Sequence, residues 1–502
     1  MQNNVVSKVV RYLPWIIFGL IFLILLIPVL NLRLFLDDHV LVFPALTHTY
    51  LQDFKMYTHD FGLYRPFRLV FLYYPLYTLY SFVPWAPFLI LFSLHVATGI
   101  LIFQILKKYL DDKLSLILGI SFIVFPFFTE QYGWIATGTT LVNFIIFLQI
   151  YIALVSKISV KAKIIWLFVL QLIGAFTYDT IFFNFILLGF LLFKKKEAWD
   201  LTKKQIGLFT LLFAIPSILY AFLRSAIFYP HNHATLREIQ LSDLPNMLSI
   251  QSHNLSVFFS SQQFLFLGKG SWMSFWQKTF MDGFNNLIHS PLSLLLLNYI
   301  VVATIGYIVM RKREAANEKI GRYNIVIIIL GLVALLSLAP SFLVTIPSFP
   351  FRVMALTYWS VLAVILIYLH SFSKQIAQIV GVAIIFAGLI FSVQMLQGMR
   401  QVYNDDDRMT TQIVKGLDEH MQNGQKATVV LENMPYSTNT VYNYGEYLAS
   451  CVRTDWCVQM ELAKKTDKVQ KVIVNPTTPP QEKGLVHTFS YNEKIKGLEF
   501  KK

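Results

Sequence analysis

Apolar stretches of about twenty residues recur along the first 396 positions of this chain, and each is long enough to cross a hydrocarbon core of about 30 Å. A segment inside a membrane must pair its own backbone groups, so it forms a helix or part of a closed barrel. Continuous apolar runs of this length indicate helices. Because 56% of the 502 residues are apolar, a water-soluble fold could not bury this surface. The sequence therefore predicts an all-α polytopic membrane domain.

The apolar runs fall into nine full-length segments and two short ones, so we expect about eleven transmembrane helices. The full-length segments lie near 13–32, 87–106, 114–129, 138–156, 206–224, 291–310, 323–343, 353–369 and 376–396, and the short ones are 164–177 and 181–193. A further apolar run, Phe67–Val83, is interrupted by Pro75 and rich in tyrosine. These features favour an interfacial helix in the first outer loop over a membrane span.

The distribution of lysine and arginine predicts the orientation. Segments 1–12, 107–113, 157–163, 194–205, 311–322 and 370–375 hold 19 Lys and Arg against six acidic residues, whereas the opposite segments up to Arg400 hold ten basic and nine acidic residues. Since cytoplasmic loops carry the excess of Lys and Arg, the N-terminus is expected in the cytoplasm. The net charge of +14 thus reports topology and not nucleic-acid binding, because residues 401–502 hold 13 basic and 13 acidic residues.

Two domains are expected, a transmembrane domain over 1–396 and a small soluble α/β domain over 397–502. With eleven spans, the α/β domain is extracytoplasmic, as are the first outer loop 33–86 and a large outer loop 225–290.

The α/β domain is predicted from its own local patterns. A charged helix is expected to begin at Asp405. The predicted strands are Ala427–Leu431, Lys471–Val474 and His487–Tyr491. Cys451 and Cys457 would pair in an oxidising compartment, and two buried free thiols are the alternative.

Two polar features lie inside the predicted spans. Residues 164–193 must cross and return within thirty residues, and arms of about thirteen residues reach only about 20 Å. The corner at 177–180 is therefore expected below the outer surface, where non-helical backbone is tolerated only against protein or a water-filled cavity. We expect Asp179 at this corner to face a cavity. His95, in the middle of a span, is expected to be a satisfied core residue.

Acidic side chains gather at the predicted outer ends of spans. Asp37 and Asp38 follow the first span and precede His39, and Glu130 ends a later span. Adjacent carboxylates at a membrane surface repel each other, so one of them tends to keep a raised pKa or to bind a cation. A carboxylate base near neutrality activates a hydroxyl nucleophile. The simpler alternative for this pair is an exposed helix cap or an interfacial charge pair.

Positive charge is expected on the same side, from Arg65, Arg68, Arg224 and Arg352. An arginine at a span end also anchors to lipid headgroups, which is the alternative for Arg224 in particular. A leaving phosphate with a second pKa of about 6 departs without a general acid. One carboxylate base and several guanidinium groups would therefore suffice to transfer a sugar from a polyprenyl phosphate.

The spacing of these motifs resembles the GT-C superfamily of polyprenyl-phosphate-sugar glycosyltransferases. The motifs are Asp37-Asp38 after the first span, Tyr64-Arg65-Pro66 before an interfacial helix, Pro126-x-x-Thr129-Glu130 at an outer end, and an acidic residue on a short hairpin. The membrane part is most similar to the transmembrane O-mannosyltransferases that carry TPR repeats, although no such repeats follow here. The sequence departs from their pattern at Phe125, Thr139 and Tyr178, where those enzymes have His, Arg and Lys.

The resemblance implies a role for each motif. Asp37 would be the catalytic base with Asp38 supporting it, and Tyr64 with its neighbours would shape the first outer loop. Glu130 would stand in the second acidic motif, and Asp179 would replace the glutamate of a Lys-Glu pair. The resemblance also implies a GT-C-like fold, inversion at the anomeric carbon and a site that faces away from the cytoplasm.

We therefore expect an inverting glycosyltransferase of the bacterial cytoplasmic membrane that moves a sugar from a polyprenyl-phosphate donor to an extracytoplasmic glycan, lipid or protein. The expected catalytic residues are Asp37, Asp38 and Glu130, and the substrate-binding residues are Tyr64, Arg65, Arg68, Asp179, Arg224 and Arg352. A monophosphate donor requires no metal, but Asp37, Asp38, His39 and Glu130 could hold Mg²⁺ or Mn²⁺. The alternative function is a lipid-linked-sugar flippase or transporter, which also needs charge within the membrane.

Overall fold

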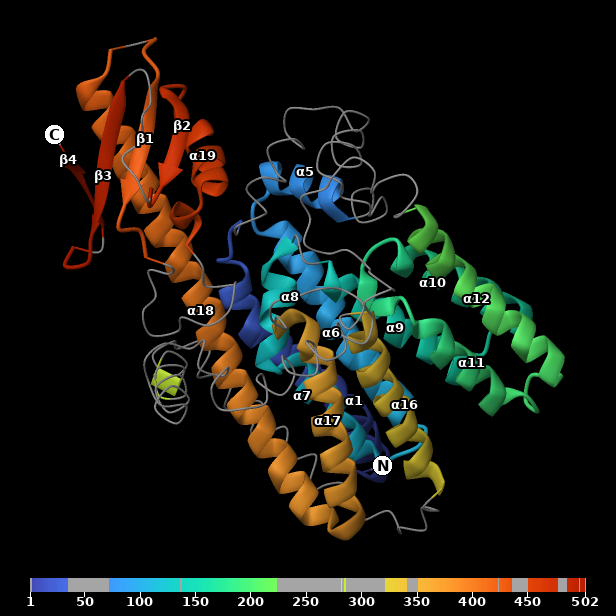
Figure 1. The fold of residues 1–502 in the computed structure, drawn as a ribbon. Coiled ribbons are helices and arrows are strands. Elements are labelled where there is room, and N and C mark those ends of the chain that lie inside the picture. The colour runs from blue at the N-terminus through green and yellow to red at the C-terminus, as the bar shows by residue number, and fades with distance from the viewer. Residues whose placement is uncertain are drawn as a thin grey trace.

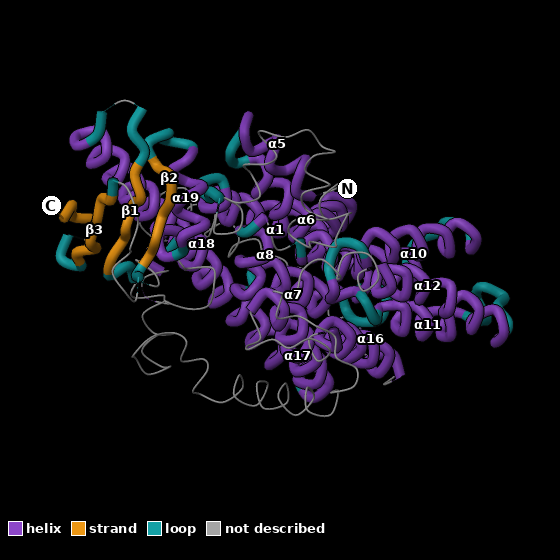
Figure 2. Tube along the Cα trace, turned by 45° about the horizontal axis from the view of Figure 1, so that its top comes forward, coloured by secondary structure: helices purple, strands orange, loops and turns teal. Residues whose placement is uncertain are grey.

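A computed structural model of the chain is mostly helical, with one small sheet near the C-terminus (Figure 1). It describes residues 2–34, 72–135, 138–223, 281, 284–285, 321–340, 351–422, 424–435, 450–476, 485–495 and 497–501. In Figure 2 the strands all lie at one side of a body made of helices.

Five of the described helices are long and apolar enough to cross a membrane, as expected of an integral membrane protein. They are α1 (Gln2–Val29), α6 (Ala86–Leu106), α12 (Lys203–Leu223), α17 (Phe351–Phe372) and α18 (Lys374–His420). Two shorter apolar helices, α9 (Thr139–Leu154) and α16 (Gly321–Leu338), match further predicted spans. The span predicted at 291–310 lies outside the described residues, so the count of eleven stays a prediction.

The span predicted at 114–129 is broken rather than straight. Helix α7 (Asp112–Ile123) ends before Pro126, and the segment Pro126–Gly133 leaves at an angle of 44°. This segment consists of a short 3-10 helix, η3 (Pro126–Phe128), and α8 (Thr129–Gly133). Proline has no N–H to donate to the preceding turn and its ring clashes with the carbonyl four residues earlier, so Pro126 favours a break at this position.

The short hairpin agrees with the sequence prediction, and the interfacial position of the 67–83 run stays a prediction. Helices α10 (Val160–Ala175) and α11 (Asn184–Lys195) are joined by a corner that includes the 3-10 helix η5 (Asp179–Ile181). Helix α5 (Tyr74–Phe82) has nine residues, about 14 Å, and is too short to cross a membrane. Figure 1 shows α5 at the end of the bundle on which the sheet domain also lies.

The C-terminal domain contains a four-stranded sheet in the order β2-β1-β3-β4. Its strands are β1 (Ala427–Glu432), β2 (Val469–Val474), β3 (Val486–Asn492) and β4 (Gly497–Lys501). The first three strands confirm the predicted ones. β1 pairs in parallel with β2 and β3, and β3 pairs antiparallel with β4. The parallel β1–β2 pair requires a crossover, which α19 (Asp455–Ala463) provides.

Helix α18 joins the membrane part to this domain. It has 47 residues and passes position 396 without a break, so a separate helix beginning at Asp405 is a wrong prediction. Its last turns bury Met409, Ile413 and Leu417 in the core of the sheet domain. One rigid element therefore contributes to both hydrophobic cores.

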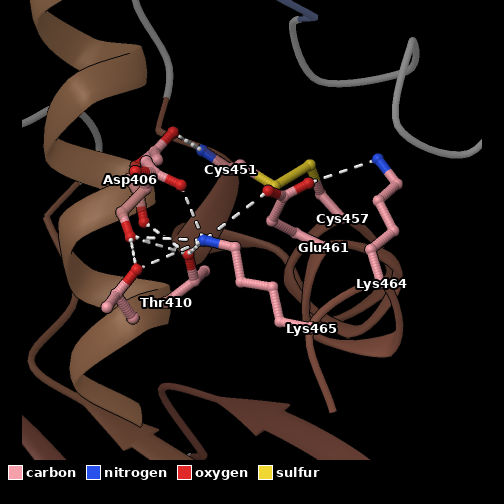
Figure 3. Close-up of polar contacts among 9 residues, drawn as sticks. Asp406, Thr410, Cys451, Cys457, Glu461, Lys464 and Lys465 are labelled. Carbon is pink, nitrogen blue, oxygen red and sulfur yellow. Dashed lines mark hydrogen bonds and ion pairs between the residues drawn. A yellow bond between two sulfur atoms is a disulfide. The ribbon is translucent and has the colours of Figure 1, made fainter. Parts of the chain in front are cut away.

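A buried carboxylate fixes the segment after Ser450 to α18 (Figure 3). Asp406 is 7% exposed and accepts hydrogen bonds from Ser450 Oγ and from the backbone N–H of Cys451, the latter at 2.7 Å. Cys451 forms a disulfide with Cys457 on α19. Of the two alternatives for these cysteines, the structure therefore has the disulfide. Asp406 joins the disulfide loop to α18 through its two hydrogen bonds.

Lys465, which follows α19, makes a second set of polar contacts with α18. Its Nζ lies 2.7 Å from Asp407 Oδ1 and 2.6 Å from Thr410 Oγ1 on α18 (Figure 3). The same ammonium is 3.8 Å from Glu461 on α19.

Tyr403 of α18 lies near charged groups of both parts of the chain. Burial and the carboxylates of Glu461 and Asp407 raise the pKa of Tyr403 to about 12, and the positive charge of Arg33, which follows α1, opposes this shift. The sheet domain therefore lies close to the chain that enters the first outer loop.

Asp406 predicts a pH-dependent stability. Burial, followed by the nearby charges of Asp405 and Glu461, raises the pKa of Asp406 to about 7, although Ser450 and Cys451 oppose the shift. Between about pH 4 and 7 the folded chain binds a proton that the unfolded chain has lost, so this group's contribution to stability falls as pH rises, by up to about 1.4 kcal/mol per pH unit. We expect Asp406→Asn to gain stability relative to wild type at pH 8 compared with pH 5, measured by thermal unfolding of the full chain in detergent.

The control for this measurement is Asp418→Asn, because Asp418 is exposed and pairs with Lys468 on the surface. An Asp406→Asn protein whose melting temperature follows pH as the wild type does would contradict the assignment of the titration to Asp406.

Candidate functional site

The described residues include part of the predicted site. Asp37, Asp38, His39, Tyr64, Arg65, Arg68 and Arg224 lie outside them. Arg352 is the second residue of α17, and its side chain is outside the described part as well. The side chains of Glu130 and Asp179 are described, and the geometry of the site is built from these two.

Glu130 lies in α8, directly after the break in the span, and is only 2% exposed. Its neighbours in sequence, Thr129 and Gln131, are also buried. Gln131 Oε1 accepts a hydrogen bond from Asn143 Nδ2 of α9 at 2.6 Å. A buried carboxyl in a membrane protein is costly and marks a functional site by default. Glu130 therefore remains a candidate, set in a polar layer between α8 and α9.

The carbonyl groups released by the break are paired by side chains from other helices. His95 Nε2 of α6 donates to the carbonyl of Ile123 at 3.1 Å, and Ser392 Oγ of α18 donates to the carbonyl of Val124 at 2.9 Å. Because a carbonyl can only accept, the proton of His95 must sit on Nε2. The prediction that His95 is a satisfied core residue is confirmed, and its partner shows that it supports the break before Glu130.

The corner between α10 and α11 is held by buried amides. Gln171 Nε2 donates to the carbonyl of Ile181 at 3.2 Å, and Ser217 Oγ of α12 donates to the carbonyl of Phe182 at 2.6 Å. Gln149 of α9 accepts from Asn184 at 2.6 Å and donates to Gln171 at 3.4 Å. Non-helical backbone inside a membrane is tolerated against protein or against a water-filled cavity, and the backbone of this corner is packed against protein.

Asp179 lies at the start of this corner and is partly exposed. Its Oδ1 accepts a hydrogen bond from Tyr220 Oη of α12 at 3.0 Å. The carboxylate is thus oriented by α12. The expectation that it faces a cavity stays a prediction.

Helix α9 contacts both segments that carry an acidic candidate, Glu130 and Asp179. Asn143 contacts Gln131, the residue after Glu130, and Ile145, two residues further on, lies against Gly174 together with Ile181 of η5. Both acidic segments therefore meet α9 at the same level. That the two carboxylates line one cavity stays a prediction.

The start of α17 lies at the same end. The rings of Phe127, before Glu130, and Tyr358 of α17 are 5.6 Å apart between centroids. Arg352 precedes Tyr358 by six residues, about 9 Å of helix. The backbone of Arg352 is therefore within two helical turns of the aromatic pair beside Glu130.

A metal site remains a prediction. The described residues contain no group of three or more His, Cys, Asp and Glu side chains that could hold a metal ion. Three of the four candidate ligands, Asp37, Asp38 and His39, lie outside those residues.

Comparisons with known proteins give two structural neighbours. No protein-family profile matches the chain, and no curated protein matches it. Structures of ArnT from Cupriavidus metallidurans in the apo state and bound to undecaprenyl phosphate align with TM-scores of 0.39 and 0.38 and identities of 10% and 9%. Each alignment covers 95% of this chain and 93% of that one. Nothing in the comparisons supports the similarity to the TPR-bearing enzymes.

The glutamine network gives a stability prediction for the corner that carries Asp179. We expect Gln171→Ala to lower the stability of the full chain by roughly 1–3 kcal/mol, because the carbonyl of Ile181 loses its donor in a buried place. Thermal unfolding in detergent would measure the change. Gln375→Ala is the matched control, since Gln375 is an exposed residue at the start of α18. Equal melting temperatures for the two variants would show that the network does not hold the corner.

Proposed function

We propose that this chain is an inverting glycosyltransferase that moves a sugar from a polyprenyl-phosphate donor to an acceptor outside the cytoplasm. The observation that carries the proposal is the buried Glu130 beside a proline-broken span, at the same end of α9 as the acidic corner at Asp179. Broken helices and buried carboxyl groups are expensive in a membrane, and they are retained where a polar substrate must enter it.

The first outer loop starts close to this region. A Cβ at Gly133, three residues after Glu130, would lie 3.7 Å from the side chain of Leu32, three residues after the end of α1. Asp37 follows Leu32 by five residues, and an extended chain of that length spans at most about 18 Å. Covalent geometry therefore keeps the Asp37-Asp38 pair within reach of the Glu130 region, which supports their assignment to one site.

The proposed reaction uses these groups in a single displacement. Asp37, with Asp38 beside it, takes the proton of the acceptor hydroxyl while the acceptor oxygen bonds to the anomeric carbon from the face opposite the phosphate. The bond from that carbon to the phosphate oxygen breaks, and the polyprenyl phosphate leaves with the electron pair. Arg65, Arg68 and Arg352 stabilise the charge that develops on the phosphate, and Arg224 is a further candidate for this role.

Glu130 and Asp179 are assigned to orienting the acceptor or a cation, and Tyr64 to shaping the loop. Should a divalent cation take part, Asp37, Asp38, His39 and Glu130 supply the hard oxygen and imidazole donors that it would need.

The disulfide supports the orientation proposed here. Cys451 and Cys457 are bonded, and structural disulfides persist in oxidising compartments. The sheet domain would then lie outside the cytoplasm, together with α5 and the end of the bundle that holds Glu130. In a bacterium the membrane would be the cytoplasmic one.

The proposal predicts that Asp37→Asn combined with Asp38→Asn lowers sugar transfer by about 10²-fold or more, because the acceptor keeps its proton. Transfer is measured in proteoliposomes with radiolabelled polyprenyl-phosphate sugars, by following label from the donor to an envelope fraction. Glu197→Gln, which alters an exposed carboxylate in the lysine-rich loop after α11, is the control. Transport of the lipid-linked sugar without a covalent product, or full transfer by the double variant, would overturn the proposal.

For Glu130→Gln we expect a smaller loss, about tenfold or more in transfer, with an unchanged melting temperature. The amide keeps the size of the buried side chain but removes its negative charge, so an orienting role is lost while packing is retained. A Glu130→Gln enzyme as active as Glu197→Gln would remove Glu130 from the site.

A further inference from the structure

One side of α18 lies along the broken segment that carries Glu130. Four buried residues of α18 contact this segment between Val124 and Gly133. They are spaced by four, three and four positions, and residues at these intervals share one side of a helix. We define the α18 face as Gly388, Ser392, Met395 and Met399.

The first two residues of the α18 face meet the backbone of Val124, the residue after α7. Ser392 Oγ donates to the carbonyl of Val124 at 2.9 Å, and the Ser392 side chain is fully buried. A Cβ added at Gly388 would lie 2.6 Å from the same carbonyl oxygen, which is too close for a real Cβ. Gly388 therefore admits the carbonyl and Ser392 pairs with it, so α18 fixes where the segment begins.

The other two residues of the α18 face meet one side of α8. Thr129 Oγ1, which donates to the carbonyl of Pro126, lies 3.4 Å from Met395 Sδ. A Cβ added at Gly133 would lie 2.9 Å from Met399 Cε. Thr129 and Gly133 are four residues apart, so they share the side of α8 that faces α18.

Other helices hold the remaining sides of α8. The rings of Phe128 and Tyr132, which share a second side, lie 5.1 and 5.0 Å from the ring of His95 of α6. Gln131 lies on a third side and is bonded to α9, and α17 also packs against α8. Since each residue turns a helix by about 100°, Glu130 projects between the sides held by α18 and α9. The direction of Glu130 therefore depends on the rotation of α8, which the contacts with α18 help to fix.

We propose that Ser392 is a positioning residue for Glu130. Through the carbonyl of Val124 it sets the start of the segment, and with the rest of the α18 face it sets the rotation of α8. The proposal rests on the proposed function of Glu130, because a carboxyl group that orients an acceptor must itself be oriented. A misplacement of about 1 Å costs about 10²-fold in rate in such sites.

The first test is a double-mutant cycle in the proteoliposome transfer assay. Ser392→Ala leaves the Val124 carbonyl without its donor in a buried place, so we expect transfer per folded protein to fall about fivefold or more. The loss is expected in kcat, with the KM for the donor within about twofold of wild type. Combined with Glu130→Gln, Ser392→Ala should lower transfer no further than Glu130→Gln alone, because Ser392 acts through Glu130.

The control for this cycle is Ser115→Ala. Ser115 is buried as fully as Ser392, and its hydroxyl donates to the carbonyl of Asp111 at the far end of α7. Losses that multiply in the double variant, or transfer by Ser392→Ala equal to that of Ser115→Ala, would overturn the proposal.

A second readout does not depend on sugar transfer. An apolar carbodiimide labels Glu130 of the full chain in detergent, and mass spectrometry measures the rate. Glu130 is 2% exposed, and we expect Ser392→Ala to raise its labelling rate about fivefold or more, because the segment opens more often without the hydrogen bond. Faster labelling in a protein that transfers no sugar as wild type would remove the proposed function and keep the positioning role. Equal labelling of wild type, Ser392→Ala and Ser115→Ala would overturn the positioning role.

A pair of glycine variants keeps the test valid should Ser392→Ala fold poorly. Gly388→Ala places a Cβ 2.6 Å from the Val124 carbonyl oxygen, and Gly381→Ala places one 2.5 Å from the side chain of Ile117, two turns earlier on the same two helices. Both variants crowd the contact between α18 and α7, but only Gly388→Ala acts at the break. We expect Gly388→Ala to transfer sugar about fivefold or more slowly per folded protein than Gly381→Ala. Equal transfer by the two variants would contradict the proposal.

Discussion

Inside a hydrocarbon layer every backbone carbonyl needs a donor from the protein itself, and the membrane part of this chain depends on how that requirement is met where helices stop. Within the described residues, two places stop a helix at depth, the break at Pro126 and the corner before α11. At the first, His95 and Ser392 supply the donors, and at the second, Gln171 and Ser217 do. Glu130 follows the break at Pro126, and Asp179 lies at the start of the corner before α11.

This arrangement gives several buried polar side chains in the spans a structural role. His95 of α6, Gln171 of α10, Ser217 of α12 and Ser392 of α18 donate to carbonyls of other segments. They allow two short non-helical segments to exist within the bundle. A candidate site can then be built from backbone that turns away from the helix axis, which a bundle of straight helices does not offer.

Much of this architecture could be predicted from the sequence, because it depends on local patterns. Apolar length gives the spans, and the short buried runs at 427–431 and 471–474 together with the alternation at 487–491 predict three strands that the structure has. The strand at Gly497–Lys501 was missed, although Leu498 and Phe500 alternate with charged residues there. What the sequence could not provide were pairings between distant residues, such as Ser392 with Val124, since neither residue type predicts its partner. The length of α18 was also missed, because a shift in composition at Gln397 does not require the helix to end.

The site itself was less predictable than the fold. Glu130 and Asp179 were chosen for their positions at span ends, and the structure adds what surrounds them: a broken span, a buried amide contact and a tyrosine hydroxyl. These surroundings come from tertiary packing that joins residues dozens of positions apart.

The uninterrupted course of α18 has a mechanical consequence. About 24 residues of this helix, roughly 36 Å, extend past Leu396 into the sheet domain. A stiff rod of that length converts a tilt of about 10° at the membrane into a sideways displacement of about 6 Å at its far tip. The position of the sheet domain would thus change with the tilt of α18 when the bundle rearranges.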